Sequence, residues 1–116
     1  MNDIKDINIT PFKYCVVFTT FNDYDLALKI KNNLFMKKLA IDVSIVESEY
    51  YYLPNREFND PESYMLIIKT KISLLDQLKK EILIMHEHDS SDFIAIPVID
   101  INIHLEDYIE KHLKRD

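Results

Sequence analysis

The chain has 116 residues, of which 47% are hydrophobic and 29% charged, and its formal net charge is −6 at pH 7. This length and mixture are typical of one folded domain, while the negative charge and the lack of a basic stripe argue against nucleic acid as a partner. No apolar run is long enough to cross a bilayer, and the complete absence of glycine excludes phosphate loops, dinucleotide fingerprints and nucleophile elbows.

The first half of the chain predicts a strand, a helix and a second strand. Residues 13–20 are rich in β-branched and aromatic side chains, and Cys15 among them is expected to be a small buried side chain that forms no disulfide. Residues 23–38 follow with apolar side chains at helical spacing. Alternation from residue 41, continued by an extended pattern, predicts an unusually long strand over 41–52.

The second half repeats this alternation of strands and helices. Residues 64–71 predict an internal strand that forms a hairpin with the preceding one, residues 73–86 a helix, and residues 93–99 a last strand. A final helix is expected over 102–114. One side of that helix is predicted to carry Leu105, Tyr108, Ile109 and His112.

The order of these elements is βαββαβ followed by one more helix. It predicts an α+β fold, a ferredoxin-like antiparallel sheet with an extra C-terminal helix. We expect an N-terminal extension over 1–12 and a single domain over 13–116. Pro97 cannot donate to a strand ladder, so it favours an edge position for the last strand, which is where this fold places it.

The end of the long predicted strand carries three consecutive tyrosines, Tyr50, Tyr51 and Tyr52. On a hairpin arm they would put aromatic surface on both faces of an edge strand, and such surface is usually covered by another chain. Tyrosine is also enriched at protein interfaces. The sequence thus predicts self-association, the alternative being a solvent-facing tyrosine run.

Residues 86–98, HEHDSSDFIAIPV, gather groups that could bind a metal. Imidazole and carboxylate are ligands of divalent ions, so His86, His88 and Asp89 are candidate metal ligands. Within one helix His86 and His88 would diverge by about 200°. They could share an ion only if the helix stops at His86. A histidine at a helix end, a solvent-exposed pair and a contact between subunits are the other interpretations that the residues leave open.

Five short blocks follow one another along the chain: Thr19-Thr20, KLAIDV from Lys38 to Val43, SEYYY from Ser48 to Tyr52, Ile68-Lys69-Thr70, and the block from His86 to Val98. Their order and spacing resemble the CutA family of divalent-cation tolerance proteins. In the last block His86, Pro97 and Val98 match the family pattern, and Asp92 stands where a glutamate is usual. Tyr52 and Tyr108 replace tryptophans.

The resemblance implies a non-enzymatic homotrimer that is built through edge strands and the long hairpin. It also implies a role in tolerance of divalent metals, with no required cofactor and weak binding of copper or another divalent metal. It makes Lys69 a candidate cleft residue, and Glu62, Asp92 and Tyr50 could line an intersubunit pocket with it. The opening residues are acidic and polar, unlike a signal peptide, so we expect a cytoplasmic protein without membrane contact.

Two other classes share this topology. A PII-like trimeric regulatory module would bind a small molecule in clefts between subunits, but its loops usually use glycine and basic residues for phosphate. An acylphosphatase needs a glycine-containing phosphate loop with arginine, and Arg56 and Arg115 lie in a turn and in the tail.

Overall fold

The structure is a computed structural model that describes residues 11–51, 53, 62–85 and 92–115. The elements in chain order are β1 (Tyr14–Phe21), α1 (Tyr24–Met36), β2 (Asp42–Glu49), β3 (Glu62–Lys71), a 3-10 turn (Ile72–Leu74) that leads into α2 (Leu75–Met85), β4 (Ile94–Pro97) and α3 (Ile103–His112). The strands form one antiparallel sheet in the order β2-β3-β1-β4. The predicted α+β, ferredoxin-like arrangement is confirmed, and Pro97 lies on an edge strand as expected.

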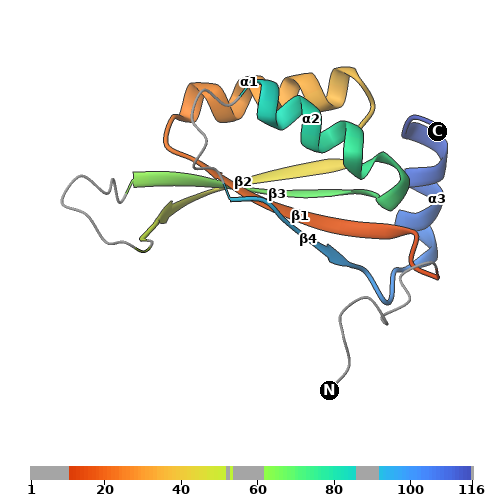
Figure 1. Cartoon of the computed structure of the whole chain (residues 1–116). Coiled ribbons are helices and arrows are strands. Elements are labelled where there is room, and N and C mark those ends of the chain that lie inside the picture. Colours follow the sequence, from red (N-terminus) through yellow and green to blue (C-terminus); the bar gives the residue numbers. More distant parts are fainter. Residues whose placement is uncertain (1–10, 52, 54–61, 86–91, 116) are drawn as a thin grey trace.

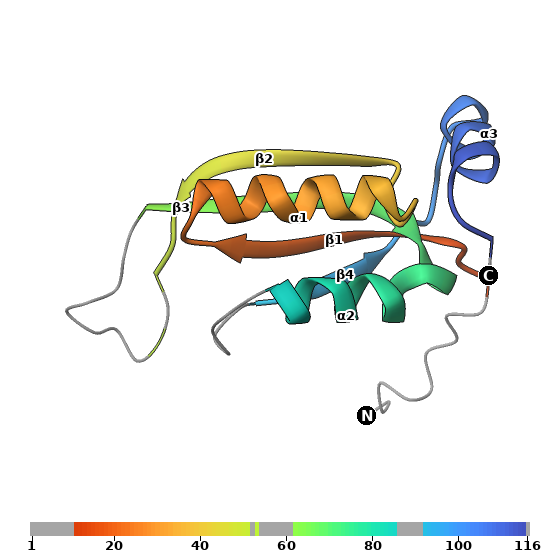
Figure 2. The same cartoon turned by 90° about the horizontal axis from the view of Figure 1, so that it is seen from above.

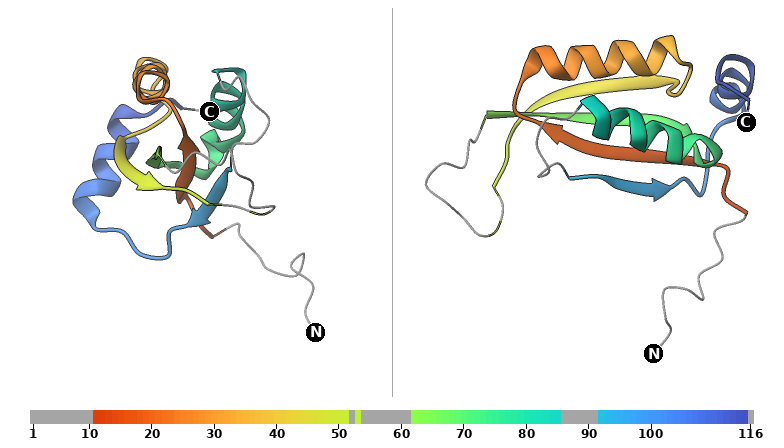
Figure 3. Two further views of the ribbon diagram at one scale, coloured as in Figure 1. Left: turned by 90° about the vertical axis from the view of Figure 1, so that its left-hand side faces the viewer. Right: turned by 45° about the horizontal axis from the view of Figure 1, so that its top comes forward.

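The helices are distributed unequally about the sheet. Figure 1 shows α1 and α2 together above one face, and Figure 2 shows that they lie side by side and run roughly along the strands. The left view of Figure 3 places α3 away from this pair, and Figure 1 shows it beside the end of the sheet where β1 begins and β3 ends. Among the described elements, therefore, no helical layer covers most of the other face of the sheet.

The face under α1 and α2, which we call the covered face, holds the core. Residues of β1 and β3 on this face, such as Val17 and Ile68, pair across the strands and are fully buried. Leu34 of α1 and Ile82 of α2 pack above them in the same cluster. Strand residues alternate between faces, so every second residue of β1 and β3 completes this core.

The alternate residues form what we call the open face. Ser44, Ile67, Phe18 and Ile94 follow one another from β2 to β4 in one cross-strand row. A neighbouring row contains Asp42, Lys69, Val16 and Ile96 in the same order. Apart from one cross-strand ion pair, these rows are mostly apolar, so the open face lacks the polar character that a solvated sheet face usually has.

Helix α1 is closed at both ends without glycine. Asp23 is the N-cap, and its carboxylate accepts from the backbone N–H groups of Asp25 and Leu26. At the other end Lys38 has φ 57°, and the backbone N–H of Leu39 donates to the carbonyl of Leu34, which closes a Schellman motif. A lysine thus occupies the left-handed position that glycine usually takes.

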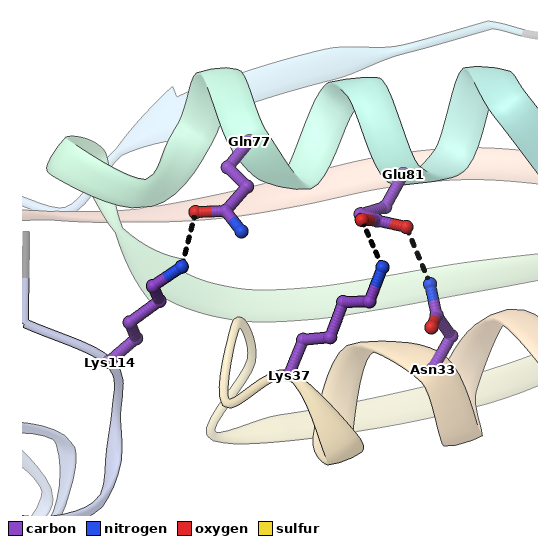
Figure 4. A network of polar contacts seen from close by, with 5 residues as sticks. All are labelled: Asn33, Lys37, Gln77, Glu81 and Lys114. Atoms are coloured by element: carbon purple, nitrogen blue, oxygen red, sulfur yellow. Dashed lines mark hydrogen bonds and ion pairs between the residues drawn. The ribbon is translucent and has the colours of Figure 1, made fainter.

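A group of polar contacts ties the helices to one another and to the C-terminal end (Figure 4). Glu81 of α2 accepts from Lys37 and Asn33, and these hydrogen bonds lower the pKa of its carboxyl. Beyond α3, the Lys114 ammonium donates to the side-chain oxygen of Gln77. The backbone N–H of Lys114 donates to the Lys38 carbonyl at 2.9 Å. The end of the chain is therefore fastened to both helices of the covered face.

One prediction about the strands is wrong. The second strand was expected to run over 41–52, but β2 ends at Glu49, so Tyr50 and Tyr51 follow it instead of belonging to it. Its last partner is Glu62 at the start of β3. Residues 54–61, which precede β3, lie outside the described residues.

Candidate functional site

Asp92 joins the end of β1 to the start of β4. Its carboxylate accepts from the Thr20 backbone N–H at 2.7 Å and from the Thr20 hydroxyl at 3.1 Å. The Thr19 hydroxyl donates to the Asp92 backbone carbonyl at 2.7 Å. Three hydrogen bonds between the Thr-Thr block and Asp92 therefore hold the start of β4 against the end of β1. Both carboxylate oxygens and the backbone carbonyl of Asp92 already accept a hydrogen bond within the chain.

Lys69 lies on the open face near the end of β3. Its ammonium is 3.2 Å from the carboxylate of Asp42, its cross-strand neighbour on β2, and both side chains are about half exposed. An exposed pair of this kind contributes about 0–1 kcal/mol to stability. Lys69 is thus placed at the surface with a partner that a ligand could displace.

The hairpin end of the sheet carries the tyrosines and Glu62. Tyr50 is half-buried, and Tyr51 is 63% exposed, with its hydroxyl 3.5 Å from Glu49. Glu62 begins β3 opposite Glu49. Tyr52 lies outside the described residues.

A single chain does not bring the predicted cleft residues together. Lys69 and Glu62 are seven residues apart on β3, which is about 23 Å along a strand, and they point to opposite faces. Asp92 is hydrogen-bonded to Thr20, which pairs on β3 with Met65 and not with Lys69 or Glu62. A pocket that combines Lys69, Glu62, Asp92 and Tyr50 therefore requires more than one copy of the chain, and it stays a prediction.

The candidate metal ligands His86, His88 and Asp89 lie outside the described residues, so their convergence also stays a prediction. Within residues 11–51, 53, 62–85 and 92–115, no three His, Cys, Asp or Glu side chains are close enough to hold a metal ion. His104 and His112 are exposed on α3, and the ring of His112 packs against Tyr108 with the centroids 4.4 Å apart.

Helix α3 is anchored to the sheet through a half-buried polar cluster. The Tyr14 hydroxyl donates to Glu110 at 2.6 Å, and the Lys71 ammonium is 3.8 Å from the same carboxylate. Burial raises the pKa of Tyr14, and the hydrogen bond to Glu110 raises it further. Lys71 also donates to the Lys114 carbonyl, so this cluster fixes both α3 and the segment after it.

Between α3 and the end of the sheet lies a cleft of about 250 Å³, which we call the α3 cleft. Its apolar lining consists of Cys15, Val98, Ile101, Leu105 and Ile109. The polar side chains on its wall are Tyr14, Lys69, Thr70, Asp100 and Asn102. Of these ten residues, the sequence analysis singled out only Lys69 as a cleft residue.

Part of the α3 cleft had a signal in the sequence. Leu105 and Ile109 were expected on one helix face with Tyr108 and His112, but only the first two face the sheet, and Tyr108 is 53% exposed. Asn102 is the N-cap of α3, with its side-chain oxygen accepting from the Leu105 N–H at 2.7 Å. A cap residue followed by Leu and Ile four residues apart indicates the start and the inner face of such a helix.

The arrangement of strands and helices agrees with the comparisons with known proteins. Residues 15–112 match the family model described as CutA1 divalent ion tolerance protein. The chain belongs to the CutA family. It is 30% identical over 95 residues to the divalent-cation tolerance protein CutA of Pyrococcus horikoshii, an alignment that covers 82% of this chain and 90% of that protein.

Solved CutA1 structures share the same fold. The crystal structure of CutA1 from Oryza sativa has a TM-score of 0.80 and 28% sequence identity, and the match covers 90% of this chain and 97% of that chain. The family is named for tolerance of divalent cations, and the membership of the CutA family that the sequence suggested is confirmed.

The comparisons leave the location of this CutA protein open. The chloroplastic protein CutA of Arabidopsis thaliana is 35% identical over 86 residues, which are 72% of this chain but 46% of that relative. The chain thus spans about half of this plant relative's length. Among the described helices none is long and apolar enough to span a membrane. The cytoplasmic location stays a prediction.

Proposed function

We propose that this CutA protein is a non-enzymatic homotrimer that takes part in the cellular response to divalent metal ions and binds copper or another divalent metal weakly. The family supports the general role in divalent-ion tolerance. The assembly and the metal are the parts that this proposal adds.

The observation that carries the assembly is the apolar open face of the sheet. Val46 on β2 and Ile94 and Ile96 on β4 are 39%, 55% and 48% exposed in the single chain. Phe18 and Ile67 lie between these strands in the same face, which makes the apolar surface continuous from one edge to the other. Monomeric proteins rarely leave contiguous apolar surface of this kind in water.

The two edges of the sheet support a ring of copies. β2 and β4 are the edge strands, so within its described residues each chain offers two different unpaired strand edges. A contact between unlike surfaces of successive copies closes into a ring when the rotation allows it. A trimer built in this way would cover the open faces of all its chains.

The chemistry of the described residues supports a role without catalysis. Burial raises the pKa of the Cys15 thiol to about 11, so the thiol is protonated at neutral pH. A protonated thiol is a poor nucleophile. His104 and His112 are exposed on α3, whereas Cys15 is buried in β1.

Sedimentation velocity with a matched pair of variants tests the assembly. At micromolar concentration the wild type is expected to have a sedimenting mass of about three times the 13.8 kDa of one chain. Ile96→Glu, on the open face, is expected to give single folded chains because a carboxylate cannot be buried there unpaired. Ile84→Glu, at a position that is 77% exposed on α2, is the control and should stay trimeric. A monomeric wild type would contradict the proposal.

Calorimetric titration with copper tests the metal. The double variant His86→Ala with His88→Ala is expected to lose most of the copper uptake, because two imidazole ligands are removed. His104→Ala with His112→Ala removes the same number of histidines from α3 and should bind copper as the wild type does. Equal uptake by both double variants would exclude the predicted ligands. A melting temperature that is raised by a nucleotide but not by copper would favour the PII-like alternative.

A further inference from the structure

The α3 cleft lies within one chain, and the role in metal response does not account for it. Its floor is apolar, formed by side chains from β1, from the segment after β4 and from α3. An engineered apolar cavity of about 150 Å³ can hold benzene. At about 250 Å³ the α3 cleft has room for a ring or a short branched chain together with one polar group.

Several polar side chains on the wall already have partners inside the chain. The Tyr14 hydroxyl donates to Glu110 at 2.6 Å, and the Thr70 hydroxyl donates to the Leu39 carbonyl at 2.6 Å. Lys69 is paired with Asp42. Because these groups already have partners inside the chain, they do not decide whether the cleft favours a positively or a negatively charged ligand.

Asp100 is the exception on the wall of the α3 cleft. It is exposed, and no ion pair joins it to any residue within the described part of the chain. Glu106 on α3 adds a second negative charge close by, since it lies near enough to Tyr14 to raise the pKa of that phenol. Lys69 and Asp100 are the two charged side chains among the ten lining residues, and Lys69 is paired with Asp42, so Asp100 carries the one lining charge without an opposite partner in the described part of the chain.

The start of α3 opposes this charge only in part. A helix N-terminus carries about +0.5 of an elementary charge, and the Asn102 side chain already satisfies the Leu105 N–H there. Half a positive charge is smaller than the full charge of Asp100 alone. The balance therefore favours a cationic guest over an anionic one.

We propose that the α3 cleft binds a small organic ammonium ion whose apolar body lies on Ile101, Leu105 and Ile109 and whose ammonium faces Asp100. The apolar floor holds the body, and the carboxylate selects the charge. All ten lining residues belong to one chain and none is a candidate metal ligand, so binding of this kind can be tested separately from the copper site.

Three probes of similar shape and different charge test the preference. Benzylammonium, benzyl alcohol and benzoate are titrated into the full-length protein at pH 7, and amide shifts are followed by two-dimensional NMR. Probes with so few atoms are expected to bind with a Kd of about 1 mM or weaker. Benzylammonium should bind about two- to fivefold more tightly than benzyl alcohol, the range expected for a solvent-exposed ion pair. Benzoate should bind most weakly.

A matched pair of substitutions assigns the preference to one carboxylate. Asp100→Asn should bring the Kd of benzylammonium to that of benzyl alcohol and leave the Kd of the alcohol unchanged. Asp107→Asn removes an equal charge from an exposed position on α3 that does not line the cleft, and it should keep the preference. Both variants are checked for an unchanged melting temperature.

Three results would overturn the proposal. They are shifts that map away from the α3 cleft, a benzoate Kd equal to or lower than that of benzylammonium, and an equal loss of preference in both variants. Absence of saturable binding by every probe would likewise overturn it.

Discussion

The two faces of the sheet differ in what covers them. On the covered face, side chains such as Val17 and Ile68 are fully buried by helices of their own chain. On the open face, their immediate neighbours Phe18 and Ile67 are apolar too, but no helix of the described chain lies over most of that side. Two adjacent residues of one strand therefore meet different environments although their chemistry is alike.

This difference separates the folding of the chain from its assembly. The covered face contains what is needed for a stable subunit, with the α1 and α2 caps and the contacts of Figure 4 around it. The open face contributes apolar surface that a single chain does not use. Substitutions on the covered face should therefore change stability at every concentration, whereas those on the open face should change mainly its dependence on concentration.

The largest expected effect comes from comparing Ile68→Ala with Ile67→Ala. Ile68 is fully buried in the core, so its truncation is expected to cost about 2–5 kcal/mol and to lower the melting temperature at all protein concentrations. Ile67→Ala removes the same atoms from the open face, and it should mainly flatten the rise of melting temperature with concentration. Thermal unfolding over a hundredfold concentration range measures both. Identical behaviour of the two variants would mean that the faces do not differ.

The next largest effect is the dependence of stability on pH that the buried thiol of Cys15 causes. The free energy of unfolding is expected to fall by about 2–3 kcal/mol as the pH rises through the pKa values of this thiol. Burial raises the pKa of Cys15 to about 11 from an ordinary value of 9.0. Between these values the unfolded chain loses its proton while the folded chain keeps it, so stability is complete below pH 9.0 and falls as the pH rises towards 11, by about 1.4 kcal/mol per pH unit.

Urea unfolding of the wild type and of Cys15→Ala between pH 8 and 11 checks this slope. The alanine variant starts from a lower stability because it leaves a small void, but it should lose less with rising pH. Tyr14, whose pKa the fold also raises, is present in both proteins and contributes equally to both profiles. Parallel pH profiles would mean that the folded state does not shield the thiol.

The smallest effect concerns the end of α1. Lys38 has φ 57°, where a side chain costs about 1 kcal/mol relative to glycine. Lys38→Gly is expected to raise the free energy of unfolding by about this amount and to leave the sedimentation coefficient unchanged. Lys38→Ala keeps a Cβ, so it is the control and should show no such gain. A gain of the same size in both variants would point to the removed charge instead of the backbone.

Much of the fold could be predicted from the sequence because it depends on local patterns. The order of elements, the Asp23 cap and the edge position of Pro97 all follow from periodicity and from the properties of single residue types. The length of β2 could not be predicted in this way. A strand continues only while it has a partner, and the partner of β2 runs out at Glu62.

The candidate site was less predictable for a similar reason. Lys69 was singled out by its family block, but its pairing with Asp42 depends on the register between β2 and β3. The α3 cleft brings Lys69 next to Asp100 and Asn102, which are about thirty residues further along the chain. No local pattern encodes that approach, because it follows from where α3 packs.

The fastening of residues 113 and 114 has a consequence for shortened forms of the chain. Leu113 is part of the core cluster, and Lys114 is bonded to the Lys38 carbonyl and to Gln77. Loss of residues 113–116 would leave every described strand and helix in place, but it would open the core at Leu113 and leave the Lys38 carbonyl without its partner. Proteolytic trimming of this short segment should therefore lower the stability of the whole subunit, although the segment contains no strand or helix of its own.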